Sequence, residues 1–190
     1  RQIDPPAEPN VIDSAGMLYY RDHVTVNLVI DGANLFPDQW IYVHAPDVKM
    51  ARLANYNNFS NEMPAKKNTT LVSVEYFTFQ NDDVWGLSNS DLVALGTEEI
   101  TRMGLIPKGS AQQGWVVRET ESYPTYYMGY QQPFDTVRFA LDRLTNCTPI
   151  GRGGMYKYNN MDHSLYTGLL AARNLLAKDG RKYDLWQVNI

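Results

Sequence analysis

The residues best suited to chemistry lie together near the C-terminus, in the run GRGGMYKYNNMDHS at positions 151–164. Three glycines come first, a group of Tyr, Asn, Asp and His follows, and a helical pattern continues to Gly180. The first amides of a helix have no intrahelical acceptor, and the helix dipole adds positive charge there, so such a segment can receive an electron-rich ligand atom. Asn159, Asn160 and Asp162 can each cap this helix. A capped helix packed on a sheet is the plainer interpretation of the same pattern.

Several common catalytic motifs are missing from the sequence. It contains no HExxH motif, no GxSxG elbow and no P-loop, and its histidines, His23, His44 and His163, are far apart along the chain. We therefore expect no metal site. No GxGxxG loop occurs either, so this chain cannot make a dinucleotide site of the usual kind by itself. No side chain stands out as an obligatory general base, and we assign no catalytic residue.

Composition and charge narrow the class of protein further. Hydrophobic residues make up 44% of the sequence, enough for a core, and a net charge of −4 with scattered basic residues argues against nucleic-acid binding. No apolar run approaches the roughly 20 residues that span a bilayer, so we expect no transmembrane segment. Cys147 is the single cysteine, which excludes an internal disulfide and favours a reducing, cytoplasmic location.

Hydrophobic periodicity predicts the elements that must hold the C-terminal run in place. Residues 23–31 alternate as a half-buried strand does, and residues 41–45 and 48–56 form a hairpin around Pro46 and Asp47. The other predicted elements are strands at 70–79 and 114–126, helices at 88–106 and 133–146, and a short strand at 147–152 before the last helix. This order predicts an α+β fold with a largely antiparallel (mixed) sheet and flanking helices.

The beginning of the chain predicts an extended connector. Pro5, Pro6 and Pro9 lie close together within residues 1–22, and the residue before a proline avoids helical backbone angles. Such a start is not typical of a native N-terminus, so we expect the chain to be cut from a longer protein.

The C-terminal run resembles the flavin-contacting motif of the UDP-galactopyranose mutases, where a similar pattern of Gly, Tyr and Asp precedes a helix. A fuller pattern is similar to the protoporphyrinogen-oxidase and amine-oxidase-like flavoproteins related to those mutases. The matching stretches are WIYVHAPDVKMAR (40–52), RLANYNNF (52–59), EYF (75–77), YPTY (123–126) and GRGGMYKYNNMDHS (151–164). The resemblance covers nearly the whole chain, and the final motif is its most specific part.

The resemblance implies an FAD-dependent oxidoreductase whose GxGxxG half lies outside this chain. The implied cofactor contacts are Gly151, Arg152, Gly154, Asn160, Met161, Asp162 and His163. Amides of the following helix would face the N1/C2=O edge of FAD, where negative charge builds on reduction. Arg52 matches a mutase arginine that holds the substrate diphosphate, and Tyr158 matches a mutase tyrosine placed for substrate contact.

The departures from the mutase pattern favour the broader oxidoreductase branch. The mutase acidic position corresponds to Asn160, and the Glu and Lys of the mutase arginine strand correspond to Asn55 and Asn57. These changes remove charges that the mutases place around the nucleotide sugar. Three alternatives stay open: a mutase-like isomerase of nucleotide sugars, a non-catalytic module that binds a sugar or nucleotide through Tyr and Trp faces, and a structural or interaction domain.

The resemblance also implies an organisation and partners. Its segments are a connector at 1–22, a substrate-binding domain at 23–146, a segment at 147–178 that closes over FAD and belongs to an incomplete FAD-binding domain, and a C-terminal tail at 179–190. The expected partners are a small-molecule substrate and the missing N-terminal half. Without that half, we expect an inactive chain with an exposed apolar patch near 150–172 and self-association through it.

Overall fold

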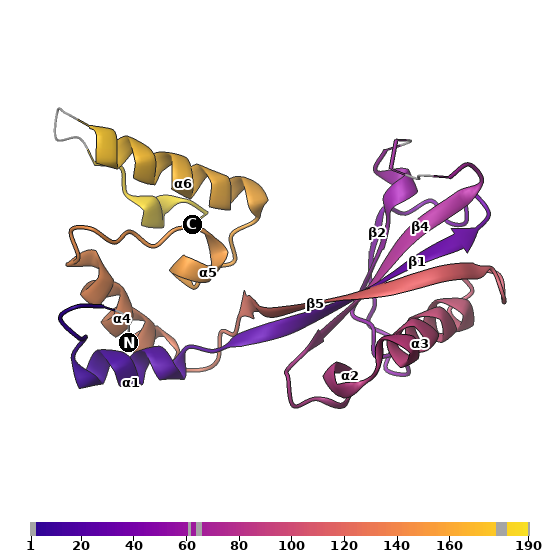
Figure 1. The fold of residues 1–190 in the computed structure, drawn as a ribbon, viewed down its shortest axis with the longest axis horizontal. Helices are drawn as coiled ribbons and strands as arrows, with labels where there is room; N and C mark the ends of the chain where they lie inside the picture. The colour runs from indigo at the N-terminus through magenta and orange to yellow at the C-terminus, as the bar shows by residue number, and fades with distance from the viewer. Residues whose placement is uncertain (1–2, 61, 64–65, 178–181, 190) are drawn as a thin grey trace. The chain divides into compact units, whose positions relative to one another are not determined.

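The computed structural model describes residues 3–60, 62–63, 66–177 and 182–189. The chain forms two compact units, one made of Arg1–Arg21 with Glu121–Ile190 and the other of Asp22–Thr120 (Figure 1). Within the described ranges, every helix is too short or too polar to cross a lipid bilayer.

A five-stranded antiparallel sheet is the main feature of the unit Asp22–Thr120, and it confirms the predicted α+β class. The strands are β1 (Tyr20–Asp31), β2 (Trp40–Tyr42), β3 (Arg52–Asn55), β4 (Thr69–Thr78) and β5 (Ala111–Pro124). Their order in the sheet is β2-β3-β4-β1-β5. The predicted hairpin is confirmed as the antiparallel pair of β2 and β3, in which Tyr42 lies opposite Arg52.

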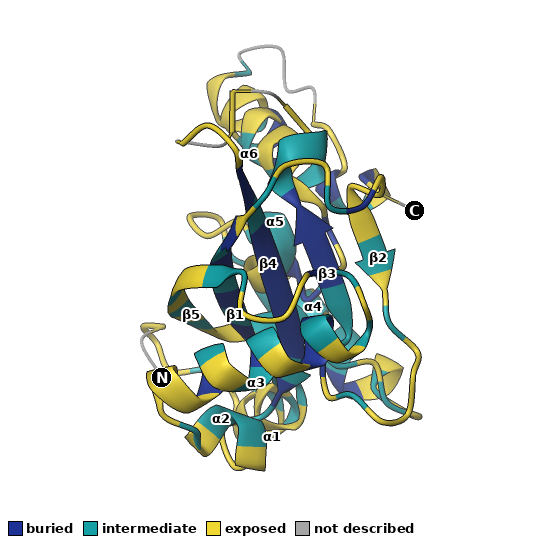
Figure 2. Ribbon diagram, turned by 90° about the vertical axis from the view of Figure 1, so that its right-hand side faces the viewer, coloured by how far each residue is buried: buried dark blue, intermediate teal, exposed yellow. Residues whose placement is uncertain are grey.

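The apolar residues that alternate along β1 form part of the main core of this unit. Val24, Val26, Leu28 and Ile30 are 0% exposed and lie on one face of the strand. On β4 the residues opposite them in register contribute Val72, Val74 and Tyr76 to the same core (Figure 2). β-Branched residues suit such a pleated, buried surface, which is why these strands were predictable.

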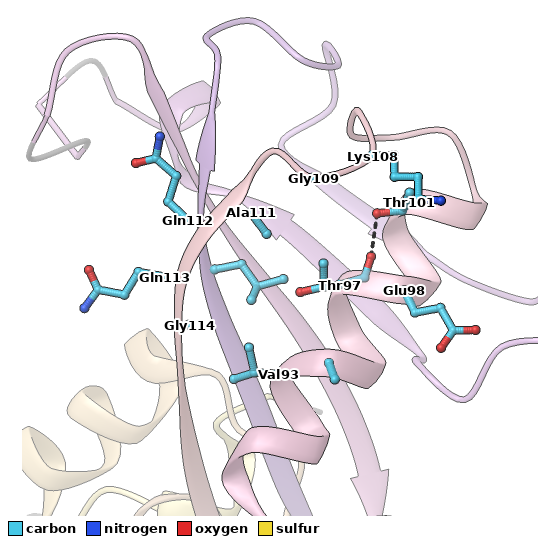
Figure 3. A pocket seen from close by; sticks show the side chains of 12 residues that line it. Val93, Thr97, Glu98, Thr101, Lys108, Gly109, Ala111, Gln112, Gln113 and Gly114 are labelled. Carbon is cyan, nitrogen blue, oxygen red and sulfur yellow. Dashed lines mark hydrogen bonds between the residues drawn. The ribbon is translucent and has the colours of Figure 1, made fainter.

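Helix α3 (Asn89–Arg102) covers this core, preceded by the short helix α2 (Asp83–Gly86). Ser88 caps α3 by accepting from Asp91 N at 3.1 Å, and Gly104, with a φ of +73°, follows the end of the helix. Figure 3 shows Val93 on α3 beside a hollow of about 500 Å³ between the helix and the beginning of β5. A Cβ on Gly114 would lie 2.7 Å from Val93 Cγ1, so glycine allows this close approach.

The other unit is mostly helical. It contains α1 (Pro9–Met17), α4 (Gln131–Asp142), α5 (Gly151–Met155), α6 (Met161–Leu176) and the 3-10 turn η2 (Leu185–Gln187). A second 3-10 turn, η1 (Tyr56–Asn58), belongs to the sheet unit. Met155, Leu170, Leu185 and Val188 form the small hydrophobic core of the helical unit.

The prediction of an extended connector was wrong for residues 9–17, which form α1. Pro9 lies in the first turn, where its missing N–H leaves no hydrogen bond unmade. Ile12 N donates to Glu8 O at 3.1 Å, and α1 packs along α4. Packing along α4 and the helical hydrogen bonds therefore outweigh the extended preference that closely spaced prolines indicated.

The predicted strand at 147–152 was also wrong, because residues 147–150 have no regular structure and α5 begins at Gly151. Pro149 has no N–H to give to a neighbouring strand. Gly151 then turns the chain with a φ of +71°, and its N–H donates to the Thr167 hydroxyl instead of to a sheet. The glycine cluster is thus a short helix that leads into a loop.

Candidate functional site

The run 151–164 folds as α5, a loop and the first turn of α6, all within the helical unit. Gly151 N donates to Thr167 Oγ1 at 3.0 Å, and this hydroxyl donates in turn to Ser164 O at 2.7 Å. Thr167 is 0% exposed, so its hydroxyl has no access to water. These bonds fix the beginning of α5 against the first turns of α6.

Tyr156 anchors the loop between the two helices. Its backbone is left-handed, with a φ of +47°, and the residue is 5% exposed. Its hydroxyl lies 2.7 Å from Thr125 O and 3.0 Å from Tyr19 O, so it can donate to either carbonyl. Burial raises the pKa of Tyr156 to about 12, although the bond to Thr125 O opposes that increase. The side chain therefore acts as a neutral hydrogen-bond donor.

A second tyrosine, which is half-buried, also holds α5. Tyr20 donates its hydroxyl to Gly153 O at 2.6 Å, and its ring meets Tyr156 edge to face at 5.1 Å between centroids. Burial, together with the nearby charge of Glu121, raises the pKa of Tyr20 to about 12. Both tyrosines thus fix the backbone of the glycine-rich segment.

Arg152 is held by groups of its own segment. Its Nε donates to Asn159 O at 2.8 Å, and its guanidinium carbon lies 4.7 Å from the centre of the Tyr123 ring and 6.0 Å from that of Tyr158. Such stacking is favourable for a planar cation. The structure therefore brings together two predicted ligand contacts, Arg152 and Tyr158, on an aromatic support.

The first turn of α6 presents polar groups and an exposed thioether. Asn160 is the N-cap residue, and its N–H donates to His163 Nδ1 at 3.2 Å, an arrangement that leaves the proton of the neutral ring on Nε2. Asp162 Oδ1 lies 3.6 Å from the same Nδ1, and its side chain is 80% exposed. Met161 is 79% exposed. The four residues predicted at this helix start are thus side by side and accessible.

Glycine backbone and apolar side chains surround this turn. A Cβ added to Gly153 would meet nothing within 4 Å, and one on Gly154 would first meet Pro149 at 3.8 Å, so the backbone of α5 is open on that side. Large hydrophobic residues in this part of the chain are also exposed: Ile150, Tyr158, Met161, Leu165, Tyr166 and Leu169. A flat, partly apolar ligand can therefore approach both the amides and the exposed rings.

Arg52 lies in the sheet unit, in a buried ionic cluster. Its Nε donates to Glu75 Oε2 at 2.7 Å, its Nη2 pairs with the same oxygen, and His23 Nε2 lies 3.1 Å from that oxygen. Burial alone would raise the pKa of Glu75, but the hydrogen bonds from His23 and Arg52 outweigh it and lower that pKa. The Arg52 guanidinium also lies 4.7 Å from the Trp40 ring and 5.2 Å from the Phe77 ring.

The asparagines of RLANYNNF complete backbone hydrogen bonding. Asn57 donates to Thr69 O at 2.7 Å and accepts from Leu71 N at 3.0 Å, so its side chain extends the hydrogen bonding of β4. Asn58 donates to Phe36 O at 2.9 Å. Asn55 Nδ2 donates to Phe36 O at 3.4 Å, and its Oδ1 accepts from Asn57 N at 3.2 Å. At Asn55 and Asn57, where the mutase pattern has Glu and Lys, this chain therefore has amides with structural partners.

Sequence reasoning missed the partners that hold these residues. Glu75 was detectable as a charged residue within an otherwise apolar strand, placed opposite Arg52 by the register of β3 and β4. Tyr156 and Lys157 had no such signal, because their acceptors come from distant parts of the chain. Lys157 Nζ donates to Trp186 O and Val188 O, and burial with the nearby Arg138 lowers its pKa against the opposing effect of Asp184.

Comparison with solved structures supports the resemblance at the level of the fold. A reduced UDP-galactopyranose mutase superposes with a TM-score of 0.77 and 17% identity over 93% of this chain. A protein from Exiguobacterium sp. 255-15 assigned as a protoporphyrinogen oxidase gives a TM-score of 0.61 and 16% identity over 80% of the chain. The chain has the fold of these two proteins. It spans 38% of the mutase chain and 33% of the oxidase chain.

Sequence comparison adds no relative to these structures. No protein-family model matches the chain. A search of curated proteins likewise finds no match. The comparison with solved structures therefore shows the fold of this chain, and the resemblance of its motifs is a separate observation from the sequence.

Proposed function

We propose that this chain is the substrate domain and the FAD-closing segment of an FAD-dependent oxidoreductase of the amine-oxidase and protoporphyrinogen-oxidase type. The observation that carries the proposal is the fold shared with the mutase over 93% of the chain, at a length of 38% of that protein. The GxGxxG half would come from the rest of a longer parent protein. This chain by itself would be inactive, and its location would be cytoplasmic.

The residues at the beginning of α6 fit such a cofactor. The amides of the first turn of α6, the open backbone at Gly153 and Gly154 and the exposed Met161 would each contact such a ligand. Together they combine donors with an apolar group, as a flat heterocycle with electron-rich edges requires. Asp162, the carboxylate of this turn, is 80% exposed, so its side chain can turn toward solvent.

Each residue would contribute by binding and orientation. FAD, when bound, would supply the redox chemistry. The α6 amides would hold negative charge at their end of the ring, since their dipoles are fixed before reaction. His163 Nε2–H would donate a further hydrogen bond, and Arg152 on Tyr123 would add a positive charge nearby. Gly151 would keep α5 in place through Thr167.

Two observations bear on the substrate. Trp40 and Tyr42 on β2 are 51% and 59% exposed, with ring centroids 5.6 Å apart, so they offer a flat surface to a sugar or a base. This surface favours, as a second candidate function, a non-catalytic module that binds a sugar or nucleotide. Arg52 beside it is neutralised by Glu75, which argues against a strong diphosphate site and so against mutase-like isomerase chemistry.

Absorbance and thermal unfolding test the proposal. The longest natural form of the protein and this 190-residue chain would be purified and their spectra recorded in the flavin bands. We expect a yellow parent and a colourless chain. A colourless parent whose melting temperature does not increase with added FAD would refute the proposal and leave the sugar- or nucleotide-binding module.

A further inference from the structure

The C-terminal residues 184–189 pack into the helical unit. Leu185 and Val188 are each 7% exposed and share a core with Met155 and Leu170. Asp184 caps η2 by accepting from Trp186 N at 2.9 Å. Residues 184–189 of the predicted tail are therefore built into the fold. The predicted tail also includes residues 179–181 and 190, which lie outside the described ranges.

Trp186 fixes the same residues against α4. Its ring meets Phe134 edge to face at 5.8 Å between centroids, and the Arg138 guanidinium lies 4.5 Å from the ring centre. Trp186 Nε1 lies 3.3 Å from Asp142 Oδ1. Residues 184–189 thus have a defined position relative to α4. In this position they can hydrogen-bond to the loop before α6.

Four hydrogen bonds connect residues 184–189 to the loop before α6. Lys157 Nζ donates to Trp186 O at 2.8 Å and to Val188 O at 2.6 Å. Asn189 Nδ2 lies 2.9 Å from Tyr158 O and 3.3 Å from Asn159 Oδ1. In two of these bonds the donor is the charged ammonium group of Lys157, and such hydrogen bonds are stronger than neutral ones.

The loop held in this way leads directly into the proposed ligand surface. The Asn159 carbonyl accepts a hydrogen bond from Arg152 Nε, and the next residue, Asn160, is the N-cap of α6. Tyr158 N donates to Tyr126 Oη at 3.2 Å. Any movement of the loop would therefore move both Arg152 and the first turn of α6.

We propose that residues 184–189 are a clamp that sets the position of the first turn of α6, and that Lys157 and Asn189 are its positioning residues. The clamp itself follows from contacts within the helical unit. Its effect on a ligand rests on the proposed function, because it assumes that FAD lies at this turn. Neither residue was recognised in the sequence as part of the site.

Hydrogen exchange on the 190-residue chain tests the clamp without any ligand. Lys157→Met keeps the length of the side chain and removes its donors, and Asn189→Gly removes the carboxamide while keeping a residue that accepts the φ of +57°. Lys182→Met is the matched control, because Lys182 Nζ donates to Asn174 O at 2.8 Å, near the other end of α6.

We expect amides of residues 157–160 and Ser164 to exchange about tenfold faster in either variant, with β1 and β4 amides unchanged. The control should exchange like the unmodified chain in this loop. Unchanged exchange at 157–164 in both variants would overturn the clamp. Equal acceleration across the sheet and the loop would also overturn it, because that result indicates general destabilisation.

FAD titration of the parent protein tests the positioning role. We expect Lys157→Met to weaken FAD binding about tenfold and to shift the reduction potential of the bound flavin, while Lys182→Met changes neither. Faster loop exchange with unchanged affinity and potential would overturn the positioning role. If the parent binds no FAD, the proposed function fails, and the exchange measurement alone decides whether the clamp exists.

Discussion

At the scale of residues, the arginines expected to contact ligands are already engaged by the protein. Arg52 is paired with Glu75 and enclosed by aromatic rings, and Arg152 donates to Asn159 O above Tyr123. The spacing of GRGGMYKYNNMDHS indicated which residues would meet at the start of α6. It could not indicate that Arg52 has a carboxylate partner, because that depends on the register of β3 with β4.

Glu75→Gln should destabilise the sheet unit by about 3 kcal/mol at neutral pH, because it removes the negative charge that faces the Arg52 guanidinium inside the cluster. Urea unfolding followed by Trp fluorescence would measure this. The pKa of Glu75 is lowered in the folded chain, so its contribution is present above the ordinary value of 4.5 and is lost as the pH falls through the lowered one.

The control for this prediction is a surface ion pair of the same unit. Asp47→Asn breaks the pair with Arg102, whose side chains are 67% and 45% exposed, and should cost less than about 1 kcal/mol. Equal effects of Glu75→Gln and Asp47→Asn would contradict the description of a buried cluster.

Tyr156→Phe should cost about 1–2 kcal/mol at neutral pH, because the buried hydroxyl that lies within hydrogen-bond distance of Thr125 O and Tyr19 O is lost. The pKa of Tyr156 is raised to about 12, so the folded chain keeps a proton that the unfolded chain releases near pH 10. Its stabilisation is complete below about pH 10 and is lost between about pH 10 and 12. The variant should show a shallower alkaline loss of stability in urea unfolding, and an unchanged slope would contradict the assignment.

At the scale of elements, hydrophobic periodicity predicted the strands and the helix that bury one apolar face. β1, β4 and α3 each place one apolar face on a shared core, and their sequences show that face directly. The beginnings of α1 and α5 were not predicted from the sequence. Pro9 begins α1 and Pro149 precedes α5, yet each lies next to extended patterns in sequence, and only packing against α4 or bonding to Thr167 decides the outcome.

Gly114→Ala should destabilise the sheet unit by about 1–3 kcal/mol, because the new methyl group would lie 2.7 Å from Val93 and 2.9 Å from Leu28. Gly86→Ala in α2 is the control, since a Cβ there meets nothing within 4 Å. Thermal unfolding of both variants would show the difference. Equal melting temperatures would mean that α3 does not approach β5 as closely as described.

At the scale of the whole molecule, we propose that the chain supplies a substrate domain and one surface of a cofactor site. Its fold matches the mutase over most of its own length but over 38% of that protein. The sequence predicted this class from motifs in several strands and one helix start. It could not predict the clamp at 184–189, because Lys157 and Asn189 meet only after α4, α6 and η2 have packed.

We propose that the beginning of α6 lies against FAD in the parent protein, and FAD titration of two variants tests this placement directly. Met161→Glu adds a charge at an exposed first-turn position, whereas Leu175→Glu adds the same charge near the end of α6, where the residue is 85% exposed. We predict that Met161→Glu weakens FAD binding about tenfold and lowers the flavin reduction potential, while Leu175→Glu leaves both unchanged. Equal affinities and potentials in both variants would contradict the account.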